Sequence, residues 1–79
     1  MFDKKVFSAR LRAKRGERDW TQGELAERSG LSLSAIVHYE DDADPGYIPG
    51  ADKLWALACA LDVDVAWLMG WDIAHPEVA

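Results

Sequence analysis

Residues 22–40, QGELAERSGLSLSAIVHYE, have the spacing of two short helices joined by a tight turn that contains a glycine. In such a pair, we expect Leu25 and Ile36 to lie in the crevice between the helices. Ala26 has to be small because the second helix crosses close above it, and Gly30 relieves the backbone at the turn. A short turn of this kind between two helices is typical of a helix-turn-helix.

The ends of these two helices are also marked. Thr21 and Glu24 match a capping box, in which the threonine hydroxyl accepts from the Glu24 N–H and the Glu24 carboxylate accepts from the Thr21 N–H. The first helix is therefore predicted over residues 22–28, with Gly30 in a left-handed conformation after it. Ser32 is predicted to cap the next helix. The inward face of that helix is expected to consist of Ala35, Ile36 and Tyr39.

Apolar residues follow helical rather than alternating spacing along the rest of the chain. Further helices are predicted over residues 5–18, 51–61 and 65–69, and the acidic and Pro/Gly-containing segment 40–50 is predicted to be a loop. We therefore predict an all-α fold in which five short helices surround one core. The expected division of the chain is a domain over 1–71 and a C-terminal tail over 72–79.

The composition fits one small globular domain. The chain has 79 residues, 49% of them hydrophobic, and no apolar run approaches the roughly 18 residues of a membrane span. The single cysteine, Cys59, excludes an internal disulfide and a four-cysteine zinc site, which favours a reducing, cytoplasmic location. Its place in the apolar stretch 51–61 predicts a small core residue.

Charge is distributed unevenly along the chain. The net charge is −5, but residues 1–28 carry eight Lys/Arg against five Asp/Glu, whereas residues 29–79 carry one against nine. A protein that binds a polyanion is usually basic overall, so the acidic balance counts against nucleic-acid binding without excluding it.

Several short motifs occur in register along the chain. They are Arg10-Leu11-Arg12 with Lys14-Arg15, Trp20-Thr21-Gln22 with Leu25-Ala26, Gly30-Leu31-Ser32 with Ile36 and Tyr39-Glu40, and Ala60-Leu61-Asp62-Val63-Asp64-Val65 with Trp67-Leu68. Together they resemble the phage-repressor and Cro-like helix-turn-helix family, also called the xenobiotic-response-element family of bacterial and phage regulators. The resemblance extends from about Phe7 to Met69 and implies the compact, five-helix lambda-repressor-like DNA-binding domain.

The resemblance also implies roles for individual residues. Thr21 and Gln22 match the positions that hold a phosphate at the start of the second helix, and Gln22 also braces the third helix. The third helix would lie in the major groove. The positions that would face base edges or the nearby backbone are Ser32, Leu33, Ser34, Val37 and His38. Arg15 and Glu40 match a pair that looks like a structural salt bridge.

The reading positions depart from the usual pattern of this family. Base reading commonly uses Arg, Lys, Gln or Asn, whereas Leu33 and Val37 offer only methyl contacts and the serines and His38 offer single hydrogen bonds. This favours an A·T-rich or weakly discriminated site. Between Ser32 and Asp44 there are four acids and no Lys or Arg. We expect modest affinity unless the loop folds away from the duplex or a dimer supplies a second half-site.

Other readings of these features remain open. The basic run in the first helix is more typical of a solvated face than of a phosphate-binding surface. The acidic segment 40–44 lacks the spacing of a calcium-binding loop, and no cofactor, metal site or catalytic constellation is predicted, so we expect no enzyme. Trp20, Trp55 and Trp67 are expected to pack in the core. Trp71, with Leu68 and Met69, could contact a twofold partner, or it could fold back over the monomer core.

The sequence therefore predicts a cytoplasmic transcriptional regulator that binds double-stranded operator DNA, as a homodimer across a pseudo-palindrome. It would be a small repressor of the phage or prophage kind, or an N-terminal domain of a longer protein. The alternative is a protein-interaction module on the same scaffold, in which the acidic loop and apolar helix face bind a toxin or another regulator. The absence of Arg and Lys after Ser32 is the feature that favours this alternative.

Overall fold

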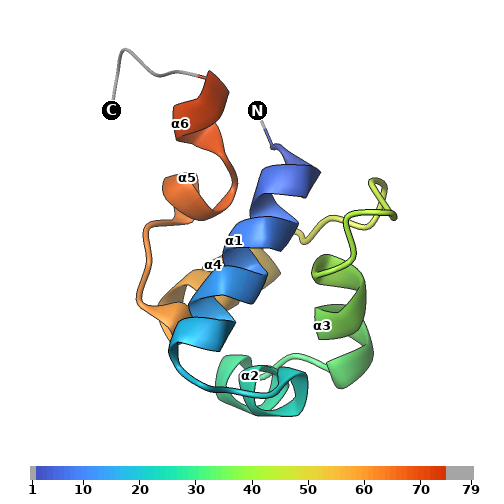
Figure 1. The fold of residues 1–79 in the computed structure, drawn as a ribbon, viewed down its shortest axis with the longest axis vertical. Helices are drawn as coiled ribbons and strands as arrows, with labels where there is room; N and C mark the ends of the chain where they lie inside the picture. The colour runs from blue at the N-terminus through green and yellow to red at the C-terminus, as the bar shows by residue number, and fades with distance from the viewer. Residues whose placement is uncertain (1, 75–79) are drawn as a thin grey trace.

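The computed structural model describes residues 2–74, and these residues form helices joined by loops, of which the one between residues 39 and 51 is long (Figure 1). The helices are α1 (Lys4–Glu17), α2 (Gln22–Ser29), α3 (Leu33–Tyr39), α4 (Ala51–Leu61), α5 (Val65–Leu68) and α6 (Trp71–Ala74). No strand occurs within the described part of the chain. The all-α class predicted from the sequence is confirmed, with one helix more than the predicted five.

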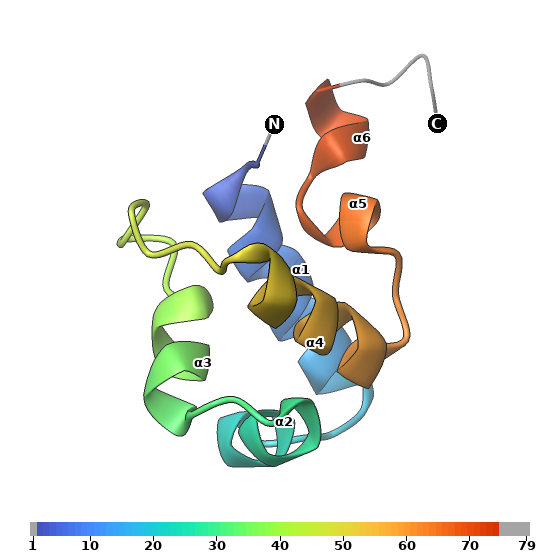
Figure 2. The ribbon, with the colours of Figure 1, turned by 180° about the vertical axis from the view of Figure 1, so that it is seen from behind.

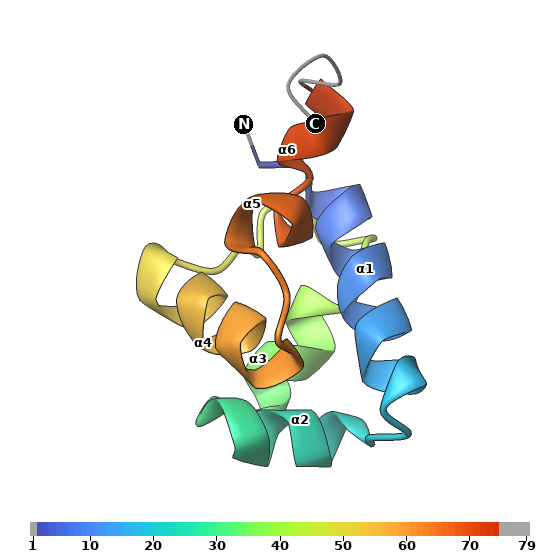
Figure 3. The same cartoon turned by 90° about the vertical axis from the view of Figure 1, so that its left-hand side faces the viewer.

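The helices enclose one core. Figures 1 and 2 show α1 and α4 in the middle of the molecule, with α2 at the end opposite α6 and with α3 and α5 on opposite sides. Figure 3 shows that α2 runs across the lower ends of the other helices. The buried apolar side chains come from α1 to α5: Phe7, Leu11, Leu25, Ala26, Ala35, Ile36, Tyr39, Leu54, Leu57, Ala58, Leu61 and Leu68.

Local sequence signals account for most helix boundaries. The Thr21 hydroxyl accepts from the Glu24 N–H at 3.1 Å, and the Glu24 carboxylate accepts from the Thr21 N–H at 2.9 Å, so the capping box of α2 is formed. Ser32 caps α3 by accepting from the Ala35 N–H at 3.1 Å, and Asp64 caps α5 by accepting from the Ala66 N–H at 2.7 Å. Gly30 ends α2 with a φ of 74°, a conformation that glycine adopts without steric cost.

Two expected core residues on α4 lie at the surface instead. Trp55 is 65% exposed, and Cys59, one turn further along the helix, is also exposed. The buried stripe of α4 consists of Leu54, Leu57, Ala58 and Leu61. Trp55 and Cys59 are four residues apart and therefore share a face next to that stripe, which turns them away from the core.

Helix α6 extends across the boundary that was expected between the domain (1–71) and the C-terminal tail (72–79). Asp72, in α6, accepts two hydrogen bonds from the Arg10 guanidinium of α1, at 2.6 and 3.0 Å. Burial of Leu68 is complete, so this residue lies in the core and not at the surface where a dimer contact was expected. Residues 75–79 of the expected tail lie outside the described residues.

Candidate nucleic-acid interface

The outer face of α3 is made of the residues that the sequence assigns to DNA reading. Ala35, Ile36 and Tyr39 are buried, so α3 is anchored by one side only. The remaining positions, all exposed, are Ser32, Leu33, Ser34, Val37 and His38. The structure thus brings these predicted residues together on one solvent-facing surface, called the α3 face below.

The turn between α2 and α3 fixes how the α3 face is presented. The Leu31 N–H donates to the Ala26 carbonyl at 3.0 Å, and the Gly30 N–H donates to the Glu27 carbonyl at 3.3 Å. These bonds satisfy carbonyl groups at the end of α2 that would otherwise lack partners. The connection between the two helices is therefore a hydrogen-bonded turn.

The N-terminus of α2 presents free backbone donors. The capping box uses the Glu24 N–H, and the Leu25 N–H donates to the Thr21 carbonyl at 3.0 Å. No acceptor among the described residues bonds the N–H groups of Gln22 and Gly23. Because the helix dipole adds partial positive charge there, these groups can bind a phosphate, as the resemblance implies for Thr21 and Gln22.

A nearly buried carboxylate ties the end of α3 to α1 and α2. Arg15 Nε donates to Glu40 Oε2 at 2.7 Å, and Arg15 Nη2 donates to Glu40 Oε1 at 3.0 Å. Gln22 Nε2 donates to the same Oε1 atom at 3.1 Å. The Glu40 side chain is 3% exposed, and its hydrogen bond with Arg15 raises the pKa of the Arg15 guanidinium. Gln22 therefore braces the site through its side chain while its backbone N–H faces outward.

Lys4 is a structural residue that the sequence analysis did not identify. Its side chain is buried, and Nζ donates to the carbonyls of His38 at 3.2 Å, Asp41 at 2.8 Å and Asp44 at 2.7 Å. A cation in this position bonds one carbonyl of the last turn of α3 and two carbonyls of the following loop, and it complements the negative end of the α3 dipole. Nothing local to Lys4 in the sequence signals this role, because its partners are 34 to 40 residues away.

The acidic loop after α3 folds back against α3. Tyr47 lies with its ring centroid 4.8 Å from that of His38 and 5.2 Å from that of Tyr39. Asp44 Oδ2 is 3.9 Å from His38 Nδ1. The loop is therefore held from one side by Lys4 and from the other by aromatic contacts, and Asp44 is kept beside the α3 face.

Most basic side chains are engaged within the protein. Arg10 and Lys14 lie over the Trp67 ring, and Arg18 and Arg28 lie over the Trp20 ring, at 4.5 to 5.3 Å from the ring centroids. Arg12 donates to the Glu40 carbonyl. Together with Lys4 and Arg15, this accounts for seven of the nine Lys and Arg residues. The basic run in α1 is thus largely a set of structural contacts, which neither of the two readings of the sequence anticipated.

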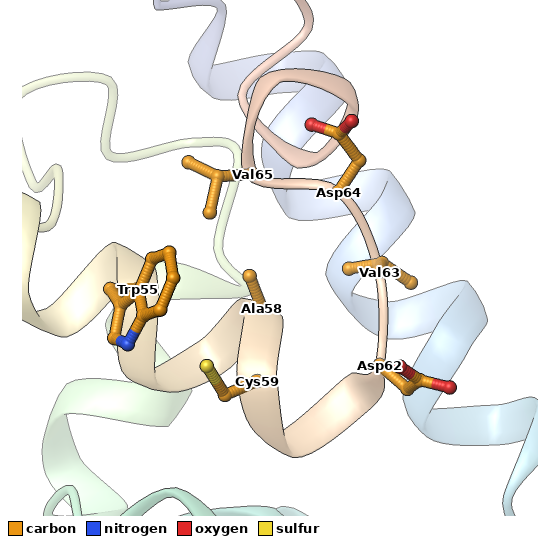
Figure 4. Close-up of a pocket in the computed structure, with 7 residues that line it drawn as sticks. All are labelled: Trp55, Ala58, Cys59, Asp62, Val63, Asp64 and Val65. Carbon is orange, nitrogen blue, oxygen red and sulfur yellow. The ribbon is translucent and has the colours of Figure 1, made fainter.

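The surfaces away from α3 are less suited to binding a ligand. A hollow of about 380 Å³ is lined by Trp55, Ala58, Cys59, Asp62, Val63, Asp64 and Val65, and the Asp62 side chain points away from it (Figure 4). Among residues 2–74, no group of His, Cys, Asp and Glu has the arrangement of a metal site. None of the helices in this range is long and apolar enough to cross a bilayer.

Comparison with known families gives one match. A family model described as helix-turn-helix matches residues 11–68, which is more than half of the chain. The matched region begins in α1 and ends with α5, so it includes both helices of the motif. No significant match was found among curated proteins or among solved structures.

Proposed function

Because the chain belongs to the phage-repressor and Cro-like helix-turn-helix family of DNA-binding regulators, we propose that it is a transcriptional repressor that reads operator DNA with α3. The proposal places α3 in the major groove and the N-terminus of α2 against a phosphate. The cytoplasm, where such DNA is found, is the expected location.

The observation that carries this proposal is the exposure of the α3 face. Leu33 is 52% exposed and Val37 is 42% exposed, although the opposite side of the same helix is fully packed. Because Leu33 and Val37 are four residues apart, they lie next to each other on the side of α3 that faces solvent, where a bound partner can contact both. Their shape and the flanking serines fit thymine methyl groups and single hydrogen bonds in a groove.

The charges of the site favour modest affinity. Seven basic side chains contact other parts of the protein, and Lys5 and Lys53 are the cations without such a contact among the described residues. Since each phosphate neutralised by a cation contributes counterion release, the absence of Lys and Arg from residues 32–44 means a weak nonspecific term beside α3. Two half-sites read by a dimer would compensate for this weakness.

A dimer surface is proposed at the C-terminal end. Trp71 is 39% exposed and Ile73 is 56% exposed, and the partly buried Met69 precedes them. With Leu68 in the core, the apolar side chains that reach the surface there are those of Trp71 and Ile73, and Met69 is partly buried beside them. A twofold contact through them would pair two α3 faces on one side of the duplex.

The experiment that tests DNA binding is fluorescence anisotropy with a random-sequence duplex at about 50 and 200 mM salt. We expect binding at the lower salt concentration and weaker binding at the higher one, with a slope of about −0.9 in log K against log salt for each phosphate neutralised. Absence of binding at low salt would contradict the proposal.

A second candidate function is a protein-interaction module. The specific observation in its favour is that the α3 face carries exposed Leu33 and Val37 but no Lys or Arg. In that case the partner would be a protein with an apolar and basic surface, such as a toxin or another regulator. Salt-independent binding to such a partner, together with no binding to duplex DNA, would favour this candidate.

A further inference from the structure

His38 differs from the other residues of the α3 face because its charge can change near neutral pH. Histidine is the side chain that ordinarily gains or loses its proton between about pH 5 and 8. The neighbouring positions on the α3 face are Ser and aliphatic residues, which have no charge to change. A proton on His38 is therefore the one way in which this face itself can become cationic.

The structure places a carboxylate beside this imidazole. Asp44 Oδ2 lies 3.9 Å from Nδ1, a distance at which an ion pair forms if the ring is protonated. The backbone at Asp44 is held in place, because the Lys4 ammonium donates to the Asp44 carbonyl at 2.7 Å. The Tyr47 ring covers one side of the imidazole. The His38 ring therefore has Tyr47 packed against it and a carboxylate nearby that can pair with its cationic form.

The other charged groups around His38 form hydrogen bonds or ion pairs with other partners. Lys4 approaches from α1, but its Nζ contacts the His38 carbonyl rather than the ring and is shared among three carbonyls. Asp41 donates its N–H to the same carbonyl at 3.2 Å, and its carboxylate accepts from the Ala43 N–H. Glu40 is paired with Arg15. Asp44 is therefore the charge that faces the imidazole directly.

The position of His38 along α3 indicates which part of DNA it would meet. In a helix-turn-helix the N-terminal residues of the recognition helix contact base edges. His38 is in the last turn of α3, next to the loop, so it would lie toward the groove wall, where the phosphates are. Nδ1 faces Asp44, and no described residue hydrogen-bonds Nε2. Nε2 is the atom that can donate outward.

We propose that His38 is a protonation-dependent phosphate contact. At high pH the ring is neutral and makes no phosphate contact, and when it is protonated beside Asp44 it donates a hydrogen bond to the DNA backbone. This inference rests on the proposed DNA binding. With His38 neutral, the His38–Asp44 site carries one negative charge next to the duplex. Protonation converts it into an ion pair with no net charge and gives Nε2 a hydrogen to donate.

The test measures the affinity for a random-sequence duplex at about pH 7.5 and 5.5, because a phosphate contact does not depend on sequence. We expect the wild-type protein to bind roughly fivefold more tightly at the lower pH and to show a salt slope steeper by up to about 0.9. The helical circular dichroism is recorded under both conditions, since the comparison requires a folded protein.

Variants at His38 separate this contact from other pH effects. His38→Gln should bind with the same affinity at both pH values and should not show the gain of the wild type at the lower pH. His38→Lys keeps its charge at both pH values and should bind tightly and equally at both. The matched control is His75→Gln, which removes the only other histidine of the chain and should leave the wild-type behaviour intact.

Asp44→Asn provides a second, independent variant. Removing the carboxylate reduces repulsion of the duplex, so affinity at the higher pH should increase.

The outcomes distinguish this inference from the proposed function. Wild-type affinity that is equal at both pH values, or a pH dependence that persists in His38→Gln, overturns the His38 contact and leaves DNA binding in place. A pH dependence that disappears in His75→Gln also overturns it. No binding at low salt by any of these proteins, His38→Lys included, contradicts DNA binding itself and the His38 contact with it.

Discussion

The Lys4 ammonium lies 2.7 Å from the Asp44 carbonyl oxygen, although 40 positions separate the two residues in the chain. With its bonds to the His38 and Asp41 carbonyls, this contact joins the start of α1 to the end of α3 and the following loop. The acidic loop is therefore a bound element of the fold, and its orientation beside the α3 face depends on one basic side chain.

Lys4→Met should loosen this loop. Methionine keeps the apolar stem but cannot donate, so three carbonyls each lose one of their two donors, and we expect a loss of about 1 to 3 kcal/mol in the free energy of unfolding. Amide hydrogen exchange should become faster at Asp44 and Tyr47. The adjacent Lys5 is exposed, so Lys5→Met is the matched control. Equal exchange in both variants would show that Lys4 does not hold the loop.

Arg15→Ala should destabilise the whole domain. It leaves the Glu40 carboxylate, 3% exposed, without its bidentate partner. Breaking such a pair costs about 2 to 3 kcal/mol here, since Arg15 itself is partly exposed, and should lower Tm by roughly 10 °C or more. Thermal unfolding followed by circular dichroism measures this. A Tm within about 2 °C of the wild type would refute a structural role for the pair.

Gly30→Ala should destabilise the turn between α2 and α3. The φ of 74° is costly for a residue with a Cβ atom, and we expect a loss of about 1 kcal/mol, although no atom would clash with the new methyl group. Gly16→Ala is the control, because Gly16 lies within α1 in equally open surroundings. It should stabilise the protein by up to about 1 kcal/mol. Chemical denaturation compares the two, and the same sign for both would contradict the assigned turn conformation.

The Arg10–Asp72 pair should make the docking of α6 sensitive to acid. The hydrogen bond from Arg10 lowers the pKa of the Asp72 carboxyl below its ordinary value of about 3.9. A lowered pKa means that the contact stabilises the folded state above that value and is lost as the pH falls through the lower, folded-state pKa. The protection of the α6 amides against hydrogen exchange, corrected for the slower intrinsic exchange in acid, should therefore fall as the pH is lowered. Asp72→Asn should show fast exchange already at neutral pH, and slow exchange in that variant would exclude the pair as the cause.

Local signals allowed much of the fold to be predicted. The capping box at Thr21, the cap at Ser32 and the left-handed Gly30 act within a few residues, and the structure contains each of them. The apolar spacing also predicted α4 with its observed limits. These features depend on hydrogen bonds and periodicity that short segments contain in full.

The remaining features depend on contacts that no local pattern contains. In the sequence, basic residues such as these arginines are typical of a charged, solvated helix face. In the structure they lie over the partly buried indole rings of Trp20 and Trp67. Residue type also misled the placement of Trp55 and Cys59, because hydrophobic residues are common at surfaces as well as in cores. The exposed set on α3 was predicted from the resemblance, and its DNA contacts stay a prediction.

The most direct measurement is the duplex affinity of Ser34→Glu compared with Ser34→Gln, two variants of nearly equal size that differ by one negative charge on the α3 face. Cys59→Glu places the same charge on the exposed face of α4. If α3 enters the major groove, Ser34→Glu should bind about tenfold or more weakly than Ser34→Gln, while Cys59→Glu remains close to the wild type. Equal affinity of all four proteins for the duplex would contradict the assignment of the α3 face as the DNA-reading surface.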